Sequence, residues 1–429
     1  MIRRLLRAPL LLAVPVVFVI GACSEKLENT AGCPVLCPGQ QLNLVDTVFD
    51  PAFTLDTTLT GFPLPGFEIP LLLATRGTEL DVRPIIRFDT LTRFYTPAGD
   101  TARPITDVDS ATLTIHLVPN GLKVPNRFTI EAYDVADTTL VDSLPQTLLP
   151  FFQPGRLFGS VTLDSAAVRD SLTVRIPLDS AKVRAIVAGG TTVLRIGLRV
   201  TSTEPASFWV VPSDDAALGP RLRYRGTPDT TIAPASLVPF SRTPRSPQNV
   251  NGDYPDYVLV AAAPDLRAIG RSTVGGLPGS RAYFRFNLPS WLIDSTAVVS
   301  AKLELVQDPV RGLDDTVAVT VRARMVLAGP ATADLFRASR LIDVAGFFIR
   351  DSVRTTPRDS GLKRLEINGA LRQWRSTPGI ASIPQAIVLI FDGEGARHSG
   401  ARFFSLEGPM ALRPRLRVTY VPNIRLGKP

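Results

Sequence analysis

The chain has little of what most enzyme sites need. Its 429 residues include two histidines, three cysteines and three tryptophans. The two histidines, His116 and His398, leave little room for general base catalysis at neutral pH. The sequence also lacks the hydrolase elbow G-x-S-x-G, the zinc-protease motif H-E-x-x-H and the phosphate-binding P-loop. We therefore expect no enzymatic activity, no catalytic residues and no cofactor.

Paired carboxylates could still serve glycosidic cleavage, so a polysaccharide-active enzyme stays as an alternative. The candidate clusters are Asp214-Asp215, Asp314-Asp315 and Asp392-Gly393-Glu394. Each lies in a turn-like context, where aspartate hydrogen-bonds its own backbone. Adjacent residues of a strand also point to opposite faces, so such pairs do not converge on one bond.

The chain carries no cluster of basic residues, although its formal net charge is +8. Arginines are spread singly, as in the alternating stretch 193–200. A nucleic-acid-binding protein would gather its basic residues on one face. We therefore predict that nucleic acid is not a partner.

The first residues indicate export and lipid anchoring. Arg3, Arg4 and Arg7 precede an apolar run, Leu10–Ile20, that is too short to span a bilayer as a mature helix. Gly21-Ala22-Cys23 follows, and this order resembles a bacterial lipobox. The resemblance implies that the thiol of Cys23 receives a diacylglyceryl group and that Cys23 becomes the new N-terminus.

This interpretation predicts a signal peptide over residues 1–22 and a lipidated tether over 23–50. Ser24 stands where an aspartate would favour inner-membrane retention, so we expect an outer-membrane lipoprotein, facing either the periplasm or the outside. An ordinary secretory signal and an uncut N-terminal anchor helix are the alternatives.

The other two cysteines lie close together in Gly-Cys-Pro-Val-Leu-Cys-Pro. In an oxidising envelope, a local disulfide between Cys33 and Cys37 is favoured over two free thiols. A metal site would need further ligands near them, and the two histidines lie far away in the sequence.

Composition and periodicity predict an all-β protein of two domains. The chain has 31 glycines and 38 prolines, and short alternating runs such as 111–118 recur between turn residues. A length of 429 residues exceeds one ordinary domain.

An internal repeat places the domain boundaries. Residues 85–89 (IIRFD) are echoed by 283–287 (YFRFN), and 219–224 (GPRLRY) by 413–418 (RPRLRV). Six such matches keep the same order, with offsets between 189 and 198. We predict one degenerate domain over residues 51–230, a linker over 231–250 and a second domain over 251–425.

The repeated elements resemble the DNRLRE domain, a module of bacterial surface proteins related to family 96 carbohydrate-binding modules. The resemblance rests on Arg281–Leu288, Ser300–Leu305, Leu365–Trp374 and Arg413–Tyr420 in the second half, and is weaker in the first. It implies two tandem antiparallel jelly-roll-like β-sandwiches, with Trp374 packed in a core. It also implies binding of polysaccharide or a protein partner at the cell surface.

Strand alternation predicts which side chains form the two cores. In the first domain these are Ile86, Phe88, Leu113, Ile115 and Leu178. In the second they are Phe284, Phe286, Leu303, Leu305, Ile367, Leu371, Leu416 and Val418.

Candidate ligand contacts are few. Sugar rings stack on exposed aromatic faces, and Trp291, Tyr254 and Tyr257 are the candidates, although Trp291 could instead cap a core. Asp253 and Asp256 supply closely spaced oxygens that would suit a weak structural Ca²⁺ site, and an interdomain linker explains the same residues. We expect a non-catalytic, envelope-anchored binding protein; a purely structural or assembly lipoprotein is the alternative. The sequence does not specify an oligomeric state.

Overall fold

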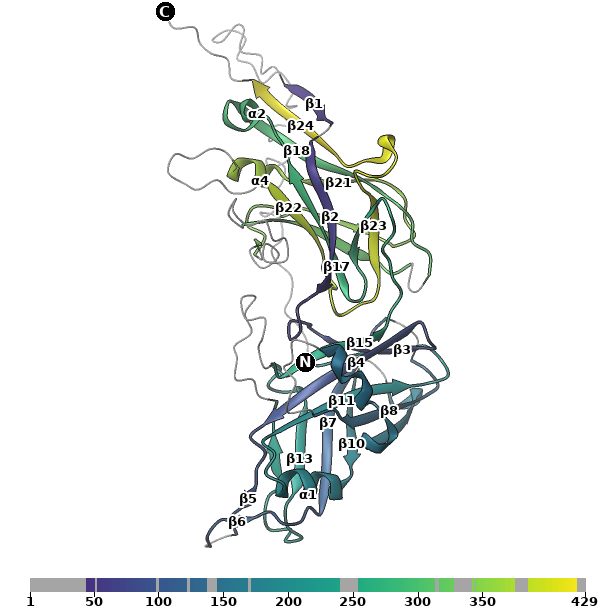
Figure 1. The fold of residues 1–429 in the computed structure, drawn as a ribbon, viewed down its shortest axis with the longest axis vertical. Coiled ribbons are helices and arrows are strands. Elements are labelled where there is room, and N and C mark those ends of the chain that lie inside the picture. Colours follow the sequence, from purple (N-terminus) through teal and green to yellow (C-terminus); the bar gives the residue numbers. More distant parts are fainter. Residues whose placement is uncertain are drawn as a thin grey trace, which may run out of the picture. The chain divides into compact units, whose positions relative to one another are not determined.

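A computed structural model of the chain describes residues 44–422. The gaps in that range are 51, 98–99, 122–123, 137–144, 169–170, 240–253, 313–315, 328–341, 344 and 375–384. The described residues form mainly β structure, in two eleven-stranded antiparallel sheets and one two-stranded sheet (Figure 1). The all-β class expected from the composition is therefore confirmed.

The first sheet closes on itself. Its strands are β3 (Leu71–Arg76), β4 (Leu80–Asp89), β7 (Ser110–Pro119), β8 (Arg127–Asp134), β9 (Leu157–Asp164), β10 (Leu172–Leu178), β11 (Val193–Thr201), β12 (Ala206–Val210), β13 (Arg221–Arg225), β14 (Ala235–Leu237) and β15 (Asp256–Ala262). The order β10-β9-β8-β11-β4-β3-β12-β7 becomes a closed eight-stranded barrel because β7 also pairs with β10. The strands β13, β14 and β15 lie outside this ring.

The second sheet combines the C-terminal half of the chain with its first strands. It holds β1 (Val45–Phe49), β2 (Phe53–Phe62), β16 (Arg271–Gly275), β17 (Gly279–Phe286), β18 (Thr296–Gln307), β19 (Val319–Met325), β20 (Ser352–Thr355), β21 (Gly361–Glu366), β22 (Ala386–Phe391), β23 (Gly400–Phe404) and β24 (Arg415–Pro422). Here β1 pairs with β24, and β2 pairs with β17.

Short helices and one hairpin complete the elements. The hairpin is β5 (Phe94–Tyr95) with β6 (Arg103–Pro104). The helices are α1 (Ser180–Ala188), α2 (Ser290–Asp294), α4 (Asn368–Gln373), and the 3-10 turns η1 (Pro145–Phe151), η2 (Pro154–Arg156), η3 (Ser165–Ala167) and η4 (Met410–Leu412). Helix α1 begins where the Asp179 carboxylate accepts hydrogen bonds from the amides of Ala181 and Lys182, which would otherwise lack partners.

The repeat seen in the sequence is a repeat of strand pairing. β4 pairs with β11 as β17 pairs with β22, and β7 pairs with β10 and β13 as β18 pairs with β21 and β24. A short helix follows β10 and β21 alike. The same pairing order in both halves supports their origin by duplication.

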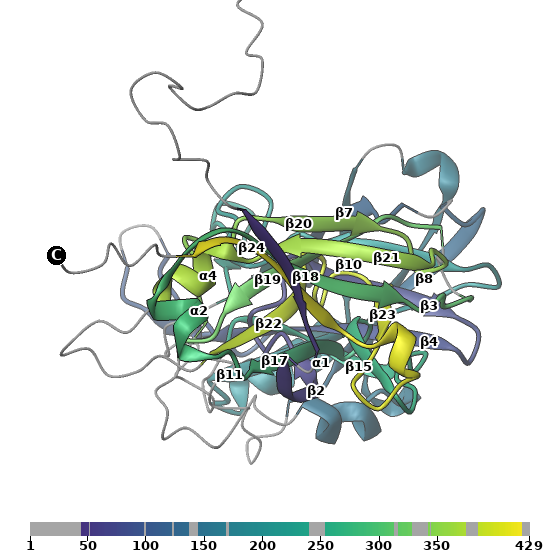
Figure 2. The ribbon, with the colours of Figure 1, turned by 90° about the horizontal axis from the view of Figure 1, so that it is seen from above.

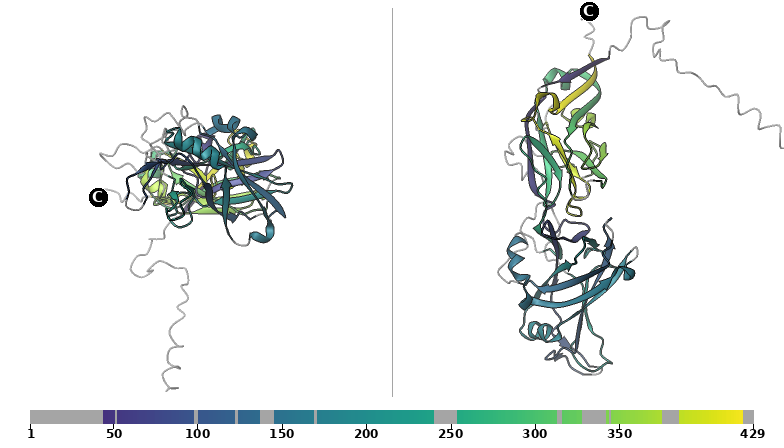
Figure 3. Two further views of the ribbon diagram at one scale, coloured as in Figure 1. Left: turned by 90° about the horizontal axis from the view of Figure 1, so that it is seen from below. Right: turned by 90° about the vertical axis from the view of Figure 1, so that its right-hand side faces the viewer.

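Strands at the start of each half pair with the other half, and β1, which pairs with β24, is one of them. β2 precedes β3 but pairs with β17, whereas β15 precedes β16 but pairs with β4. Purple β2 accordingly lies among green and yellow strands in Figure 1 and in the right-hand view of Figure 3. Strand pairing thus crosses the boundaries drawn from the repeat, 51–230 and 251–425. It also corrects the irregular tether expected over 23–50, since 45–49 form β1, and the linker over 231–250, since 235–237 form β14.

All the predicted core residues are buried. Ile86, Phe88, Leu113 and Ile115 are at most 1% exposed, and Leu178 is 7% exposed. The eight residues predicted for the second core range from 0% to 4%. Each set belongs to a separate apolar cluster. Alternation along the strands was therefore a reliable guide to the inward faces.

Candidate functional site

An aromatic cluster lies at one end of the second core. It joins Phe49 of β1, Trp291 of α2 and Tyr420 of β24. The Trp291 ring centroid lies 6.2 Å from that of Phe49 and 5.6 Å from that of Tyr420, and both ring pairs are tilted. Figures 1 and 2 both place α2 beside the end of β24. Phe49 and Tyr420 are half-buried against the core, whereas Trp291 is 44% exposed.

The helix α2 explains why Trp291 faces outward. The next two side chains, Leu292 and Ile293, are 0% and 4% exposed and anchor the helix in the core. Successive helical residues are turned about 100° apart, so a residue beside this anchor points away from it. The Ser295 amide donates to the Trp291 carbonyl oxygen at 3.0 Å and ends the helix. The Trp291 ring is thus held on a short, well-anchored turn.

Charged side chains fix the strand that carries Phe49. The Glu304 carboxylate, with a side chain 7% exposed, accepts hydrogen bonds from Arg364 at 3.0 Å and Arg417 at 3.2 Å. Arg417 also donates to Asp46 of β1 at 2.7 Å. These residues connect β21, β18, β24 and β1 in sequence. The strand β1, which carries Phe49, is therefore held to β24 by charged side chains as well as by backbone pairing.

Two of the three predicted ligand-contacting aromatics are buried, which corrects the prediction. Tyr254 is 2% exposed and Tyr257 is 0% exposed, so neither offers a ring face to a ligand. Tyr254 packs against Phe67 with ring centroids 6.1 Å apart, and fits because Gly66 has no side chain: a Cβ there would lie 2.3 Å from the Tyr254 ring. The structure does not bring these tyrosines together with Trp291, since they belong to different apolar clusters.

The other tryptophans are engaged within the protein. Trp374 is 6% exposed and packs 5.2 Å from Phe286, which confirms its expected place in the core. Trp209 is half-buried, and its Nε1 donates to the Ala396 carbonyl oxygen at 2.8 Å. Trp291 is thus the tryptophan with an exposed ring face.

The loop considered for calcium does not form an open cluster of oxygens in the described residues. Asp256 is 0% exposed and accepts a hydrogen bond from the Ser213 amide at 2.6 Å. Asp253 lies outside the described residues, as do Cys23, Cys33 and Cys37. Within the described part of the chain, no group of three or more histidine, cysteine, aspartate or glutamate residues is placed to hold a metal ion.

Both histidines occupy structural positions. His116 lies on β7 and its Nδ1 is 3.1 Å from the Thr173 hydroxyl of the neighbouring β10. His398 is 4% exposed in the turn before β23. Neither is near the aromatic cluster by any described contact, so neither contributes to the candidate site.

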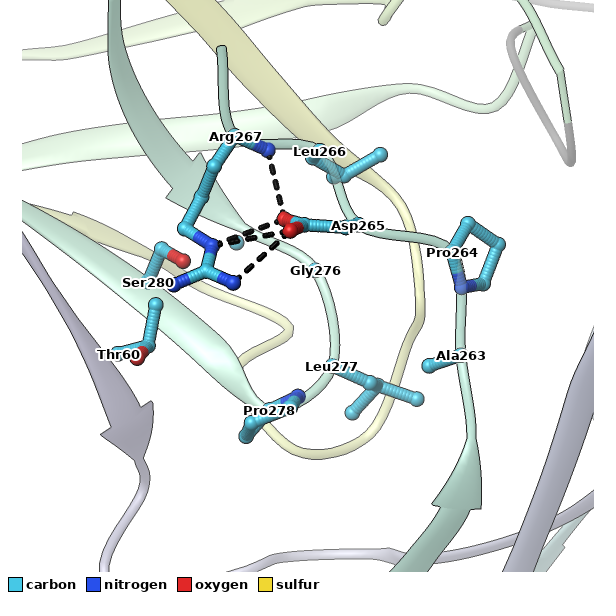
Figure 4. A pocket seen from close by; sticks show the side chains of 11 residues that line it. Thr60, Ala263, Pro264, Asp265, Leu266, Arg267, Gly276, Leu277, Pro278 and Ser280 are labelled. Carbon is cyan, nitrogen blue, oxygen red and sulfur yellow. Dashed lines mark hydrogen bonds and ion pairs between the residues drawn. The ribbon is translucent and has the colours of Figure 1, made fainter. Parts of the chain in front are cut away.

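Two cavities of the described chain are small. The one in Figure 4 has about 180 Å³ and is lined by Thr60, the segment 263–267 and the turn 275–278. Its charged residues, Asp265 and Arg267, pair with each other at 2.8 Å. Cavities that enclose a drug-sized ligand usually hold roughly 300–1,000 Å³. The cavity in Figure 4 is below that range.

A second cavity of about 190 Å³ contains a buried acid that the sequence did not single out. Glu68 is 5% exposed, and its carboxylate accepts hydrogen bonds from the amides of Gly66 at 2.7 Å and Val258 at 3.2 Å. Burial raises the pKa of Glu68 to about 8, against the weaker opposite effect of these amides. Glu68 thus joins the turn after β2 to β15.

Comparisons with known proteins give no family. No protein-family model and no curated protein matches the chain. Similar solved structures include a "putative secreted protein" of Parabacteroides distasonis (10% identity; 88% of this chain and 98% of that chain covered; TM-score 0.19). Another is Macrobrachium rosenbergii nodavirus (10% identity; 93% of this chain and 99% of that chain covered; TM-score 0.15). A third is infectious bursal disease virus, Gx strain (12% identity; 91% of this chain and 80% of that chain covered; TM-score 0.14). No helix among the described residues is long and apolar enough to cross a membrane.

Sequence reasoning missed two members of the aromatic cluster, Phe49 and Tyr420. The burial of β1 alternates, with Val45, Thr47 and Phe49 half-buried and Asp46 and Val48 exposed, but the sequence VDTVF does not alternate between apolar and polar residues and so did not mark this strand. Nothing local indicated that this strand would pair with β24.

Proposed function

We propose that the chain is a non-catalytic lipoprotein of the bacterial outer membrane that binds polysaccharide through the exposed face of Trp291. The lipobox-like order at Cys23 supports the anchor, and the resemblance to tandem jelly-roll-like DNRLRE domains supports the ligand class. The observation that carries the proposal is the 44% exposure of Trp291 on an anchored turn.

The chemistry follows from the indole ring. A pyranose presents a face of C–H groups, which loses water and gains dispersion contacts when it covers an aromatic ring. Phe49 and Tyr420 hold the indole at a fixed tilt, so the ring loses little side-chain entropy on binding. One exposed ring implies weak binding of each sugar unit, which a repetitive polymer or several anchored copies would strengthen.

A glycan array tests the ligand. The probe is a soluble form, residues 40–429, which keeps all described residues. We expect binding to a defined set of polysaccharides, and loss of that binding in Trp291→Ala. Phe94→Ala is the matched control, because Phe94 is an exposed aromatic (56%) on the separate hairpin β5–β6. If Trp291→Ala still bound the same polysaccharides, the binding site would have to lie elsewhere on the protein.

A structural or assembly role is the second candidate, favoured by the contacts of Trp291 with Phe49 and Tyr420, which also cap the core. It predicts that no glycan binds and that Trp291→Ala only lowers stability. Anchoring is tested separately by metabolic labelling with a clickable fatty acid. Labelling should be lost in Cys23→Ala and kept in Cys33→Ala; a Cys23→Ala protein that still labels would refute the anchor.

A further inference from the structure

The strand β2 is recognised by more than backbone pairing. Its main chain pairs with β17 from Phe53 to Phe62. Its side chains also reach other elements: the Thr58 hydroxyl accepts from the Thr273 amide of β16 at 3.0 Å, and Asp56 accepts from the Leu406 amide at 2.7 Å. We call the surface formed by β16, β17 and the turn after β23 the acceptor groove. It binds specific side chains of β2 as well as its backbone.

Aromatic contacts fix both ends of the strand in the groove. The Phe53 ring lies 4.7 Å from that of Phe286 and 5.8 Å from that of Phe284. At the other end, Phe62 is 2% exposed and lies 4.1 Å from the guanidinium of Arg281. The register shifts by one residue between Phe53 and Leu55 and again between Thr60 and Phe62. The two phenylalanines therefore hold the strand on the outer side of these irregularities, and Leu55–Thr60 pair without a break between them.

The counterpart strand shows that this position accepts a strand from outside its own half. β15 pairs with β4 as β2 pairs with β17, so each half pairs with a strand from the start of the other. The acceptor groove therefore binds its strand because the side chains fit, and not because the strand lies next to it in the sequence. The turn between β2 and β3, residues 63–70, includes Pro63, Pro65 and Pro70, which favour extended backbone on either side.

We propose that the acceptor groove binds residues 53–62 of a second copy of the chain, so that two copies exchange this strand together with β1, which precedes it and pairs with β24 of the same sheet. The exchanged dimer would make the same β2 contacts as the monomer. The equilibrium between monomer and exchanged dimer then depends on the chain concentration and on the conformation of the turn 63–70, as in other exchanges of identical elements. The groove recognises a specific segment, which has two phenylalanines nine residues apart and Asp56 and Thr58 between them.

Cysteine cross-linking of the soluble chain 40–429 tests this proposal, because that form contains no native cysteine. Leu55 and Arg285 lie opposite each other in the β2–β17 register, and Arg285 is exposed. Chains carrying Leu55→Cys alone and Arg285→Cys alone are mixed, unfolded in urea, refolded together at high concentration and oxidised. We expect a disulfide-linked dimer that joins Cys at 55 to Cys at 285, identified by peptide mass.

Two controls show whether the cysteine pair can bond and how much dimer forms by random collision. The double variant Leu55→Cys/Arg285→Cys must cross-link within one chain, which shows that the pair can bond. Mixing Leu55→Cys with Ser236→Cys, an exposed position on β14, measures random collision. If the double variant cross-links but the mixed single variants yield no more dimer than the Ser236 control, strand exchange between copies is refuted.

Discussion

The carboxylate of Asp56 accepts a hydrogen bond from the backbone amide of Leu406 at 2.7 Å, across 350 residues of sequence. Asp56 also lies 3.4 Å from the Ser272 hydroxyl, and burial raises its pKa. One side chain thus satisfies the amide of a turn in the C-terminal half and holds the first long strand there. The contact makes the N-terminal segment part of the second sheet.

Replacing Asp56 should therefore destabilise the second sheet. Asp56→Ala leaves the Leu406 amide without its acceptor, and we expect a loss of about 1–3 kcal/mol in the free energy of unfolding. Asp56→Asn keeps an acceptor oxygen and should cost less. Urea unfolding measures both, and Thr54→Ala, on an exposed residue of the same strand, is the control. An Asp56→Ala protein as stable as the control would show that the contact contributes nothing.

Glu68 should make stability fall as pH rises. Its pKa is raised from 4.5 to about 8 in the folded chain, so the folded state holds a proton that the unfolded state releases. The contribution of Glu68 to the free energy of unfolding is full below about pH 4.5. It decreases by roughly 1.4 kcal/mol per pH unit above that and is lost above about pH 8. Glu68→Gln should flatten this part of the profile. Urea unfolding from about pH 5 to pH 8 compares the two; parallel profiles would refute the assignment.

Local sequence was enough to predict the cores but not the exchange of strands. Phe284 and Phe286 alternate with Arg285 on one strand, and that period alone indicates their inward face. Residues 53–62 show what local sequence leaves open, because either β4 or β17 could pair with such a strand. Tyr254 followed a loop-like stretch of Asn, Gly and Asp, which predicted exposure. Its burial depends on Gly66 and Phe67, which lie almost 190 residues earlier.

The ion network around Glu304 predicts an asymmetry between its members. Glu304 is nearly buried, whereas the side chains of Arg364 and Arg417 are 55% and 39% exposed. Removing both arginines leaves a buried carboxylate without its charged partners, whereas Glu304→Gln leaves two cations that water can solvate. The double variant Arg364→Ala/Arg417→Ala should therefore unfold at lower urea than Glu304→Gln. Arg267→Ala, at an exposed ion pair, is the control for simple loss of charge. The reverse order of midpoints would refute the explanation.

The strand pairing also predicts which piece of the chain can rebuild the second sheet. Val45 at the start of β1 lies opposite Tyr420 near the end of β24. A short hairpin linker from residue 422 to residue 45 would therefore join 264–422 to 45–62 in one permuted chain that holds every strand of this sheet. The piece 250–429, which contains the second domain predicted from the repeat (251–425), lacks β1 and β2 and carries β15, whose partner β4 is absent. Its acceptor groove would expose the apolar residues that Phe53 covers in the intact chain.

We expect the permuted chain to unfold in one cooperative transition in urea, with near-UV circular dichroism from Trp291 and Trp374 in fixed surroundings. Residues 250–429 alone should bind the dye ANS and lack a sharp transition, because a hydrophobic strand position stays open. Adding a peptide of residues 44–62 in trans should restore the transition, and the same peptide with Phe53→Ala should do so less well, since that side chain is 6% exposed in the intact sheet. If residues 250–429 fold as cooperatively as the permuted chain without any peptide, β1 and β2 are dispensable and the acceptor groove is not a binding site.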